Sequence, residues 1–263
     1  MSVGEKMKIF KDLYNYRELL KSNVKKEIRG KYKGSFLGVI WSFVNPLLMV
    51  IVYAVVFPYI MRIQEKDYLI FLITGVIPWN FFTTVISQGT TTILINANII
   101  KKVYFPREIL PISVVLSGLI NFLISCIIIL VFLIIGGLGI TPYILYLPLI
   151  CIIQFVLSLS IVFVLCAIDI YVRDTEYIVN FIIMLLFYLT PVLYSPNMLP
   201  ARFRFILALN PMSHIINAYR DIFYVQRTPE LINLSIVGMA SVILLIIGYS
   251  IFKKLEKGFA EEI

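Results

Sequence analysis

Residues that could perform catalysis are scarce in this chain and stand far apart. His214 is its single histidine, and one imidazole gives neither a zinc site nor a Ser-His-Asp triad, so a structural, hydrogen-bonded role is favoured. Asp174 and Glu176 stand beside Arg173 and are more typical of a salt-bridged loop than of an acid–base pair. The three cysteines lack C-x-x-C spacing and are typical of small apolar core residues. We therefore predict a protein that is not an enzyme and holds no metal.

The sequence also lacks the residues that would supply energy for transport. No G-x-x-x-x-G-K-[ST] motif occurs, so the chain has no P-loop for nucleotide phosphates. Its apolar segments hold no carboxylate at mid-depth, and Asp169 lies at the end of one of them. Transporters driven by ion gradients usually need buried ionisable groups. We expect a transport subunit that binds no cofactor and is powered by a separate protein.

Neutral polar and aromatic residues are dense in several apolar segments and would suit a sugar cargo. Sugars are recognised by hydrogen bonds to their hydroxyl groups and by rings packed on their C–H faces. The predicted channel-lining residues are Tyr53, Phe57, Trp79, Phe82, Thr84, Ser87, Gln88, Tyr188 and Tyr194. Two alternatives stay open. The aromatic residues could lie at the membrane interfaces, where Trp and Tyr collect, and the Ser and Thr residues could pack helices together.

Residues 98–108 combine basic charge with apolar side chains. The segment reads Asn98, Ile99, Ile100, Lys101, Lys102, Val103, Tyr104, Phe105, Pro106, Arg107 and Glu108. Pro106 ends any helix here, and the basic residues favour the cytoplasm. The apolar side chains could fill a groove on another protein, so a docking loop is predicted. The alternative is an ordinary basic loop that rests on lipid.

The elements that position these residues are predicted to be membrane-spanning helices, which makes the fold all-α. Of the 263 residues, 60% are hydrophobic and 14% are charged, which excludes a disordered chain and argues against a soluble domain. Crossing the hydrocarbon takes roughly 20 mostly apolar residues. Six segments qualify, at residues 36–60, 68–95, 109–135, 143–168, 177–194 and 231–252.

Positive charge predicts how these spans are oriented. Ten of the 23 Lys and Arg residues lie within residues 1–35, and three more lie in the tail 253–263. Basic residues mark the cytoplasmic side and anionic lipid, so both termini are predicted to be cytoplasmic. The net charge of +8 is attributed to this topology, and nucleic-acid binding is not expected.

Two segments are predicted to touch the membrane without crossing it. Within residues 1–35, residues 7–33 repeat apolar side chains at a helical period between basic ones. This pattern is typical of an amphipathic interfacial helix, acting either as an anchor or as a collar for a partner or an anionic headgroup. Residues 195–217 are too short to span and contain Asn210-Pro211, so they are predicted to form a re-entrant hairpin within the 36–252 transmembrane domain.

Six blocks, in this order along the chain, resemble the permease subunits of ABC-type polysaccharide exporters. They are Lys33-Gly34-Ser35-Phe36-Leu37-Gly38 with Trp41-Ser42 and Asn45-Pro46; Gly75-Val76-Ile77-Pro78-Trp79-Asn80-Phe81-Phe82; residues 101–111; Arg173-Asp174; Thr190-Pro191-Val192-Leu193-Tyr194; and Asn210-Pro211 with Tyr219-Arg220-Asp221. The resemblance covers roughly residues 25–225. It departs mildly at Thr190, where Ser is expected before the proline.

The resemblance implies two copies of this permease working with two copies of a separate ABC ATPase, which would bind ATP and Mg²⁺. The cargo would be O-antigen, capsular polysaccharide or wall teichoic acid linked to a polyprenyl diphosphate, exported across the bacterial cytoplasmic (inner) membrane. It further implies that residues 98–108 form the coupling helix, that the 195–217 hairpin borders the exit and that the 7–33 helix is the cytoplasmic gate. We add that Arg29, Lys31 and Lys33 could contact the diphosphate through charge-assisted hydrogen bonds.

A polymer longer than the bilayer is thick cannot be enclosed in one midplane pocket. We therefore expect a continuous channel between two copies of the chain, with several weak binding sites along it. The nearest alternative is the permease of an ABC exporter for drugs or lipids. A less favoured alternative is a membrane-embedded sugar transferase.

Overall fold

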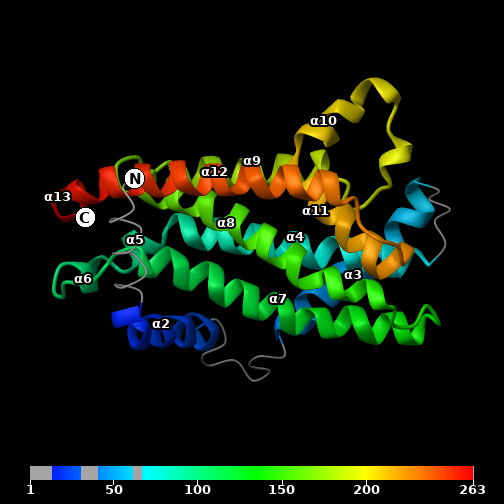
Figure 1. Ribbon diagram of the computed structural model, residues 1–263, viewed down its shortest axis with the longest axis horizontal. Helices are drawn as coiled ribbons and strands as arrows, with labels where there is room; N and C mark the ends of the chain where they lie inside the picture. The colour runs from blue at the N-terminus through cyan, green and yellow to red at the C-terminus, as the bar shows by residue number, and fades with distance from the viewer. Residues whose placement is uncertain (1–13, 31–40, 62–66, 263) are drawn as a thin grey trace.

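The computed structural model describes residues 14–30, 41–61 and 67–262. Every regular element in these ranges is helical, which confirms the all-α prediction. The long helices run side by side along the long axis of the molecule (Figure 1). The short helices α5 (Thr92–Ile95), α6 (Ala97–Ile100) and α13 (Phe259–Glu262) lie at one end. The helices α10 (Arg204–Leu209) and α11 (Pro211–Arg220) lie toward the other end.

Within the described ranges, four helices are long and apolar enough to cross a membrane, as expected of a multi-pass membrane protein. They are α4 (Tyr68–Thr90), α7 (Ile109–Ile135), α8 (Leu147–Asp169) with the 3₁₀ turn Pro142–Tyr146 before it, and α12 (Leu231–Leu255). Their positions agree with four of the six predicted spans. Helix α4 is the most buried of the four and α12 the least, so α4 lies at the centre of the packed chain.

The two remaining predicted spans correspond to shorter apolar helices. Helix α3 (Trp41–Met61) has 21 residues, and α9 (Thr175–Leu189) has 15. Helix α9 ends before residue 194 because Thr190 is extended, as a residue that precedes a proline prefers to be. The non-helical segment that follows, residues 190–194, forms turns and bends; we call it the extended chain because it begins with the extended residue Thr190. It is buried, since Thr190 and Val192 are both 0% exposed.

A buried amide joins three helices at a proline in the central helix. Pro78 lies inside α4, and its carbonyl oxygen accepts a hydrogen bond from Gln154 Nε2 of α8 at 2.9 Å. The Tyr219 hydroxyl of α11 donates to Gln154 Oε1, also at 2.9 Å. Gln154 is fully buried, so these two bonds satisfy both ends of an amide that would otherwise be costly to bury.

The segment predicted as a re-entrant hairpin contains two helices that meet at Asn210. Pro211 occupies the first turn of α11, where its missing N–H costs nothing, and Asn210 Oδ1 caps this helix by accepting from Met212 N at 3.0 Å. Helix α11 packs on α4 and α8 and continues as a π-helical turn, Asp221–Val225. The helical chain therefore continues beyond residue 217, the predicted end of the hairpin, and buried side chains such as Tyr219 and Phe223 continue its apolar face.

The basic segment near the N-terminus forms helix α2 (Arg17–Gly30), which packs against α7. A shallow apolar groove of about 370 Å³ separates the two helices, lined by Leu20, Lys21, Val24, Lys25, Ile28, Leu116 and Ile120. Lys26 Nζ donates to Asn96 Oδ1 at 2.9 Å, which ties α2 to the junction of α5 and α6. Residues 7–13 and 31–33 of the predicted helix lie outside the described residues.

Candidate functional site

Several blocks that carry the family resemblance meet at Arg220, although they are far apart in the sequence. Arg220 is 4% exposed. It donates from Nη2 to the Val192 carbonyl oxygen at 2.7 Å and from Nη1 to the Pro191 carbonyl oxygen. Its guanidinium carbon lies 3.6 Å from the centroid of the Phe71 ring of α4. Arg220 thus binds the extended chain after α9 to both α11 and α4.

Gly75 allows this close packing. A Cβ atom at this position would lie 2.7 Å from the Val192 carbonyl oxygen and 2.8 Å from Arg220 Nη2, so only glycine fits between α4 and the extended chain.

The substitution Gly75→Ala is expected to destabilise the protein by about 1–3 kcal/mol, because the added methyl group forces the Arg220 hydrogen bonds apart. The matched control is Gly238→Ala in α12, where the nearest atom would lie at an ordinary 3.6 Å. Thermal unfolding of the detergent-solubilised proteins compares the two. Equal melting temperatures for the two variants would contradict the proposed crowding at Gly75.

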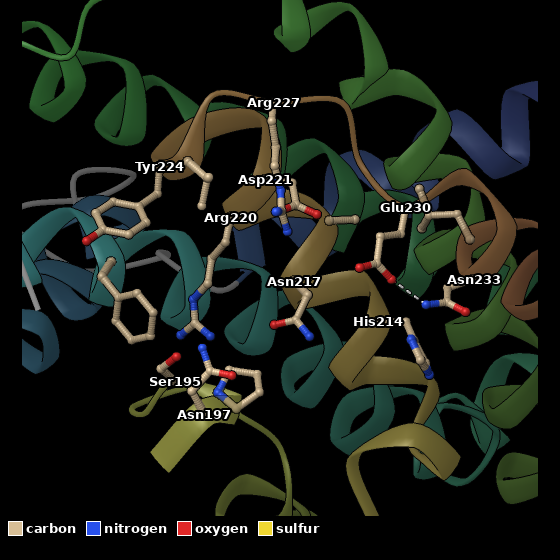
Figure 2. Close-up of a pocket in the computed structure, with 15 residues that line it drawn as sticks. Ser195, Asn197, His214, Asn217, Arg220, Asp221, Tyr224, Arg227, Glu230 and Asn233 are labelled. Atoms are coloured by element: carbon tan, nitrogen blue, oxygen red, sulfur yellow. Dashed lines mark hydrogen bonds and ion pairs between the residues drawn. The ribbon is translucent and has the colours of Figure 1, made fainter. Parts of the chain in front are cut away.

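A polar cavity of about 460 Å³ lies beside Arg220, at the end of the bundle remote from α6 and α13 (Figures 1 and 2). Its walls come from the start of α4, the segment after α9, α11 with its π-helical turn, and the start of α12. Its polar lining residues are Ser195, Asn197, His214, Asn217, Arg220, Asp221, Tyr224, Arg227, Glu230 and Asn233. We name this the Asn217 cavity, after the residue at its centre in Figure 2.

The charged side chains of the Asn217 cavity all have polar partners. Arg227 Nε donates to Asp221 Oδ1 at 2.7 Å. Burial raises the pKa of the Asp221 carboxyl above its usual value, and this ion pair opposes the shift. Asn233 Nδ2 donates to Glu230 Oε2 at 2.5 Å. His214 Nε2 lies 2.9 Å from the Ala208 carbonyl oxygen, so His214 is hydrogen-bonded, as the sequence favoured.

The predicted docking segment, residues 98–108, divides into exposed and buried side chains. Tyr104 is 92% exposed and Val103 is 58% exposed, whereas Phe105 is 6% exposed and packs into the core of the chain. Asn98, Ile99, Lys101 and Lys102 are also exposed, Ile100 and Glu108 are buried, and Pro106 and Arg107 are half-buried. The side chains available to a partner are therefore those of residues 98–104, apart from Ile100.

The buried part of this segment is fixed to the C-terminal end of α12. Glu108 Oε2 accepts from Lys253 Nζ at 2.9 Å, and Lys253 Nζ also donates to Glu256 Oε2 at 2.8 Å. Arg107 Nη1 donates to the Glu256 carbonyl oxygen at 2.7 Å. Phe259 of α13 is fully buried and lies below the Arg107 guanidinium. These contacts join the docking loop directly to the C-terminal end of α12.

The ion pair between Glu108 and Lys253 is expected to contribute about 1 kcal/mol to stability, a modest value because Lys253 is partly exposed and keeps Glu256 as a second partner. A double-mutant cycle with Glu108→Gln and Lys253→Met measures the coupling free energy between the two side chains directly. The expected coupling free energy is about 1 kcal/mol in chemical or thermal unfolding. Strictly additive effects of the two substitutions would show that the pair is energetically neutral.

Most of the predicted channel-lining residues gather between α3, α4 and α9. The ring centroids of Trp79 lie 5.7 Å from Phe82 and 5.8 Å from Phe187, and Tyr53 lies 6.2 Å from Phe187. Trp79 and Phe82 are buried within the chain.

The remaining predicted lining residues are more accessible. Tyr188 is 65% exposed, Gln88 is exposed and Thr84 is half-buried. The hydroxyl of Ser87 donates to Asn180 Oδ1 at 2.8 Å, and that of Tyr194 to the Tyr188 carbonyl oxygen at 3.0 Å. The side chain of Phe57 lies outside the described residues.

The three residues predicted to contact a lipid diphosphate also lie beyond what the structure describes. Lys31 and Lys33 fall in the range 31–40, and Arg29 belongs to α2 without a described side chain. Among the described residues, no group of three His, Cys, Asp or Glu side chains could hold a metal ion. Cys126, Cys151 and Cys166 are buried free thiols, in agreement with the prediction of apolar core residues.

Comparison with known proteins decides the family. Residues 18–224 match the ABC-2 type transporter family. The chain belongs to this family. It is 36% identical over 260 residues to an O-antigen export system permease protein of Myxococcus xanthus, covering 98% of this chain and 100% of the relative. A Klebsiella pneumoniae protein of the same description is 37% identical over 247 residues, covering 93% of this chain and 94% of the relative.

A more distant relative, the polysialic acid transport protein KpsM of Escherichia coli, is 22% identical over 244 residues, or 88% of this chain and 91% of the relative. The resemblance to ABC polysaccharide-export permeases is thus confirmed. As an ABC-2 family permease, the chain is a transport subunit, and its family implies an ATPase partner.

The sequence did not predict two features of the site. Arg220 was recognised only as part of a motif, and its role in holding the extended chain 28 residues away emerges from its hydrogen bonds. The Asn217 cavity was not predicted either. A usable signal was the set of asparagines Asn197, Asn217 and Asn233 close to the Arg220-Asp221 pair.

Proposed function

We propose that this chain is the membrane permease of an ABC exporter that moves a polyprenyl-diphosphate-linked polysaccharide, of the O-antigen type, across the bacterial cytoplasmic membrane. The observation that carries the proposal is the similarity to O-antigen export permeases over nearly the full length of both chains. The missing P-loop and the exposed docking loop support it, since both are expected of a subunit driven by a separate ATPase.

In the proposed assembly two copies of this chain form the channel and each receives one ATPase subunit, which binds ATP and Mg²⁺. The ATPase contacts the coupling loop formed by residues 98–108, chiefly through its exposed side chains; only residues 98–100 of this loop are helical, as the end of α6, so the expected coupling helix is shorter than predicted. Support comes from Tyr104 and Val103, large apolar residues left exposed between Lys102 and Arg107. An aromatic anchor with basic neighbours is typical of a protein–protein contact.

The proposed topology has six spans, with α3 and α9 completing the four long helices, and both termini in the cytoplasm. The coupling loop, α13 and the basic end of α12 share one end of the molecule, and the hairpin of α10 and α11 lies toward the other (Figure 1). Basic residues favour the cytoplasmic side, so the end with the coupling loop and the basic residues of α12 is cytoplasmic. The hairpin then lies toward the opposite side of the membrane, as the re-entrant element that borders the exit. Helix α2 is then the cytoplasmic gate.

We further propose that the exposed and half-buried members of the aromatic and neutral polar cluster on α3, α4 and α9 face the polymer when two chains meet, with Trp79 and Phe82 packed behind them. The arrangement suits a sugar chain, because rings such as Tyr188 offer flat apolar faces beside hydroxyl and amide groups such as Gln88. Arg29, Lys31 and Lys33 remain the proposed contacts for the lipid diphosphate at the gate.

Reconstitution of the permease with its ATPase in proteoliposomes tests the proposed function. Lipid-linked polysaccharide is expected to stimulate ATP hydrolysis and to become accessible on the far side of the membrane. Stimulation by small hydrophobic compounds, without any by lipid-linked glycan, would instead indicate an exporter of drugs or lipids. Turnover of a lipid-linked sugar by this chain alone, without ATP, would indicate a sugar transferase.

A further inference from the structure

The Asn217 cavity has the size and composition of a ligand site, and neither the motifs nor the family explains it. Its volume of about 460 Å³ lies within the range of about 300–1,000 Å³ that is usual for small-molecule sites. It opens at the end of the bundle opposite to the coupling loop, where the proposed function places the exit.

The charges of the cavity exclude a strong anion site. Arg227 is paired with Asp221, and the negative charge of Glu230 offsets the positive charge of Arg220 in the formal charge of the lining. The guanidinium of Arg220 is directed to the carbonyl oxygens of Pro191 and Val192. The cavity is therefore polar but close to neutral, and a phosphate or diphosphate would meet two carboxylates at its wall.

The uncharged polar groups offer hydrogen bonds from two sides. Ser195 and Asn197 approach from the segment after α9 and Asn217 from α11 (Figure 2), and within the described part of the chain their side chains make no hydrogen bond. Glu230 and Asn233 form a hydrogen-bonded pair on another wall. An amide that can both donate and accept, with a carboxylate nearby, matches the two adjacent hydroxyl groups of a sugar ring.

An aromatic wall adds an apolar surface. Tyr224 lines the cavity beside these polar groups, and its ring lies edge-to-face with that of Phe71 at a centroid distance of 5.7 Å. Phe71 is 4% exposed and lies under the Arg220 guanidinium, so Tyr224 supplies the accessible ring. A ring face next to hydroxyl-binding groups suits a ligand that is polar at its rim and apolar on its C–H face.

We propose that the Asn217 cavity binds one neutral saccharide unit, with Asn217 and the Glu230–Asn233 pair recognising adjacent hydroxyl groups. The inference rests on the proposed function, because the ligand is then a unit of the exported glycan near the exit. A weak site here holds emerging polymer between cycles of ATP hydrolysis and opposes its backward movement, without halting passage.

Saturation-transfer-difference NMR on the permease–ATPase complex in lipid nanodiscs tests the proposal. The probes are the methyl glycosides of mannose, galactose, glucose, N-acetylglucosamine and rhamnose, with inorganic pyrophosphate as a competitor. At least one glycoside is expected to bind. Asn217→Ala should weaken that binding roughly tenfold, which corresponds to about 1.4 kcal/mol. The matched control is Asn15→Ala, an exposed asparagine at the α2 end of the chain, which should bind like the wild type.

Several binding results would overturn the proposal. No binding by any glycoside excludes a saccharide site, and displacement by pyrophosphate indicates an anion site. If Asn217→Ala does not yield folded protein, Asn233→Ala takes its place, because Asn233 belongs to the proposed recognition pair. Wild-type glycoside affinity in that variant then rejects the cavity as the binding site. Glycan export is measured on the same wild-type complex. If the complex shows Asn217-dependent glycoside binding but exports no glycan, only the proposed function is refuted. If it exports glycan without such binding, only this inference is refuted.

Discussion

Replacing Arg220 by Gln is expected to lower the free energy of unfolding by about 3–5 kcal/mol, enough to prevent accumulation of a folded permease. The guanidinium is buried and bonded to the carbonyl oxygens of Pro191 and Val192, and it lies on the Phe71 ring. Gln is too short to reach both carbonyl groups. Two buried acceptors then lose their charged donor, and the extended chain after α9 detaches from α4.

Size-exclusion profiles and thermal unfolding of the solubilised variants measure this effect. The control is Arg173→Gln, which makes the same change at an exposed residue between α8 and α9. It should cost no more than about 0.5 kcal/mol. A stable, monodisperse Arg220→Gln protein would mean that these hydrogen bonds contribute little to the fold.

Replacing Tyr104 by Ala is expected to reduce glycan-stimulated ATP hydrolysis at least tenfold while leaving the permease folded. Tyr104 is 92% exposed in the single chain, so removing its ring costs the fold almost nothing. If it is the anchor in the ATPase groove, its loss removes about 2 kcal/mol or more of binding free energy. ATPase affinity and coupled hydrolysis are measured in the same reconstituted preparation.

Two companion variants separate docking from folding. Tyr104→Phe keeps the ring and should retain most of the coupling. Phe105→Ala removes a buried side chain and should lower thermal stability by about 3–5 kcal/mol, whether or not the ATPase is present. Undiminished coupling in Tyr104→Ala would exclude this residue from the ATPase contact.

Long uninterrupted apolar runs were predicted well because nothing local competes with helix formation in them. The span 109–135 agrees with α7 at both ends, and 68–95 begins where α4 begins. The fifth span was placed too far along the chain because apolar residues continue to Tyr194. Its true end depends on Thr190 preceding a proline, and on Tyr68 and Arg220 holding the extended chain that follows.

The exposure of individual side chains in the docking loop could not be predicted from the sequence. The loop's composition predicted apolar side chains available to a partner, and Tyr104 is indeed exposed. Composition alone could not separate Tyr104 from its neighbour Phe105, because their opposite exposure follows from packing against distant helices. The partner of Glu108 lies 145 residues further along the chain, beyond the reach of any local pattern.

In the proposed six-span topology, in which α9 crosses the membrane, the shortness of this helix has a consequence for the surrounding lipid. Its 15 residues rise about 22 Å, whereas bilayer hydrocarbon is about 30 Å thick. Protein covers the extended chain that follows, but acyl chains beside α9 still face a hydrophobic mismatch. The bilayer must thin at this helix, or α9 must be shielded by another helix. Local thinning would lower the headgroups toward the hairpin and shorten the barrier that a polymer has to traverse.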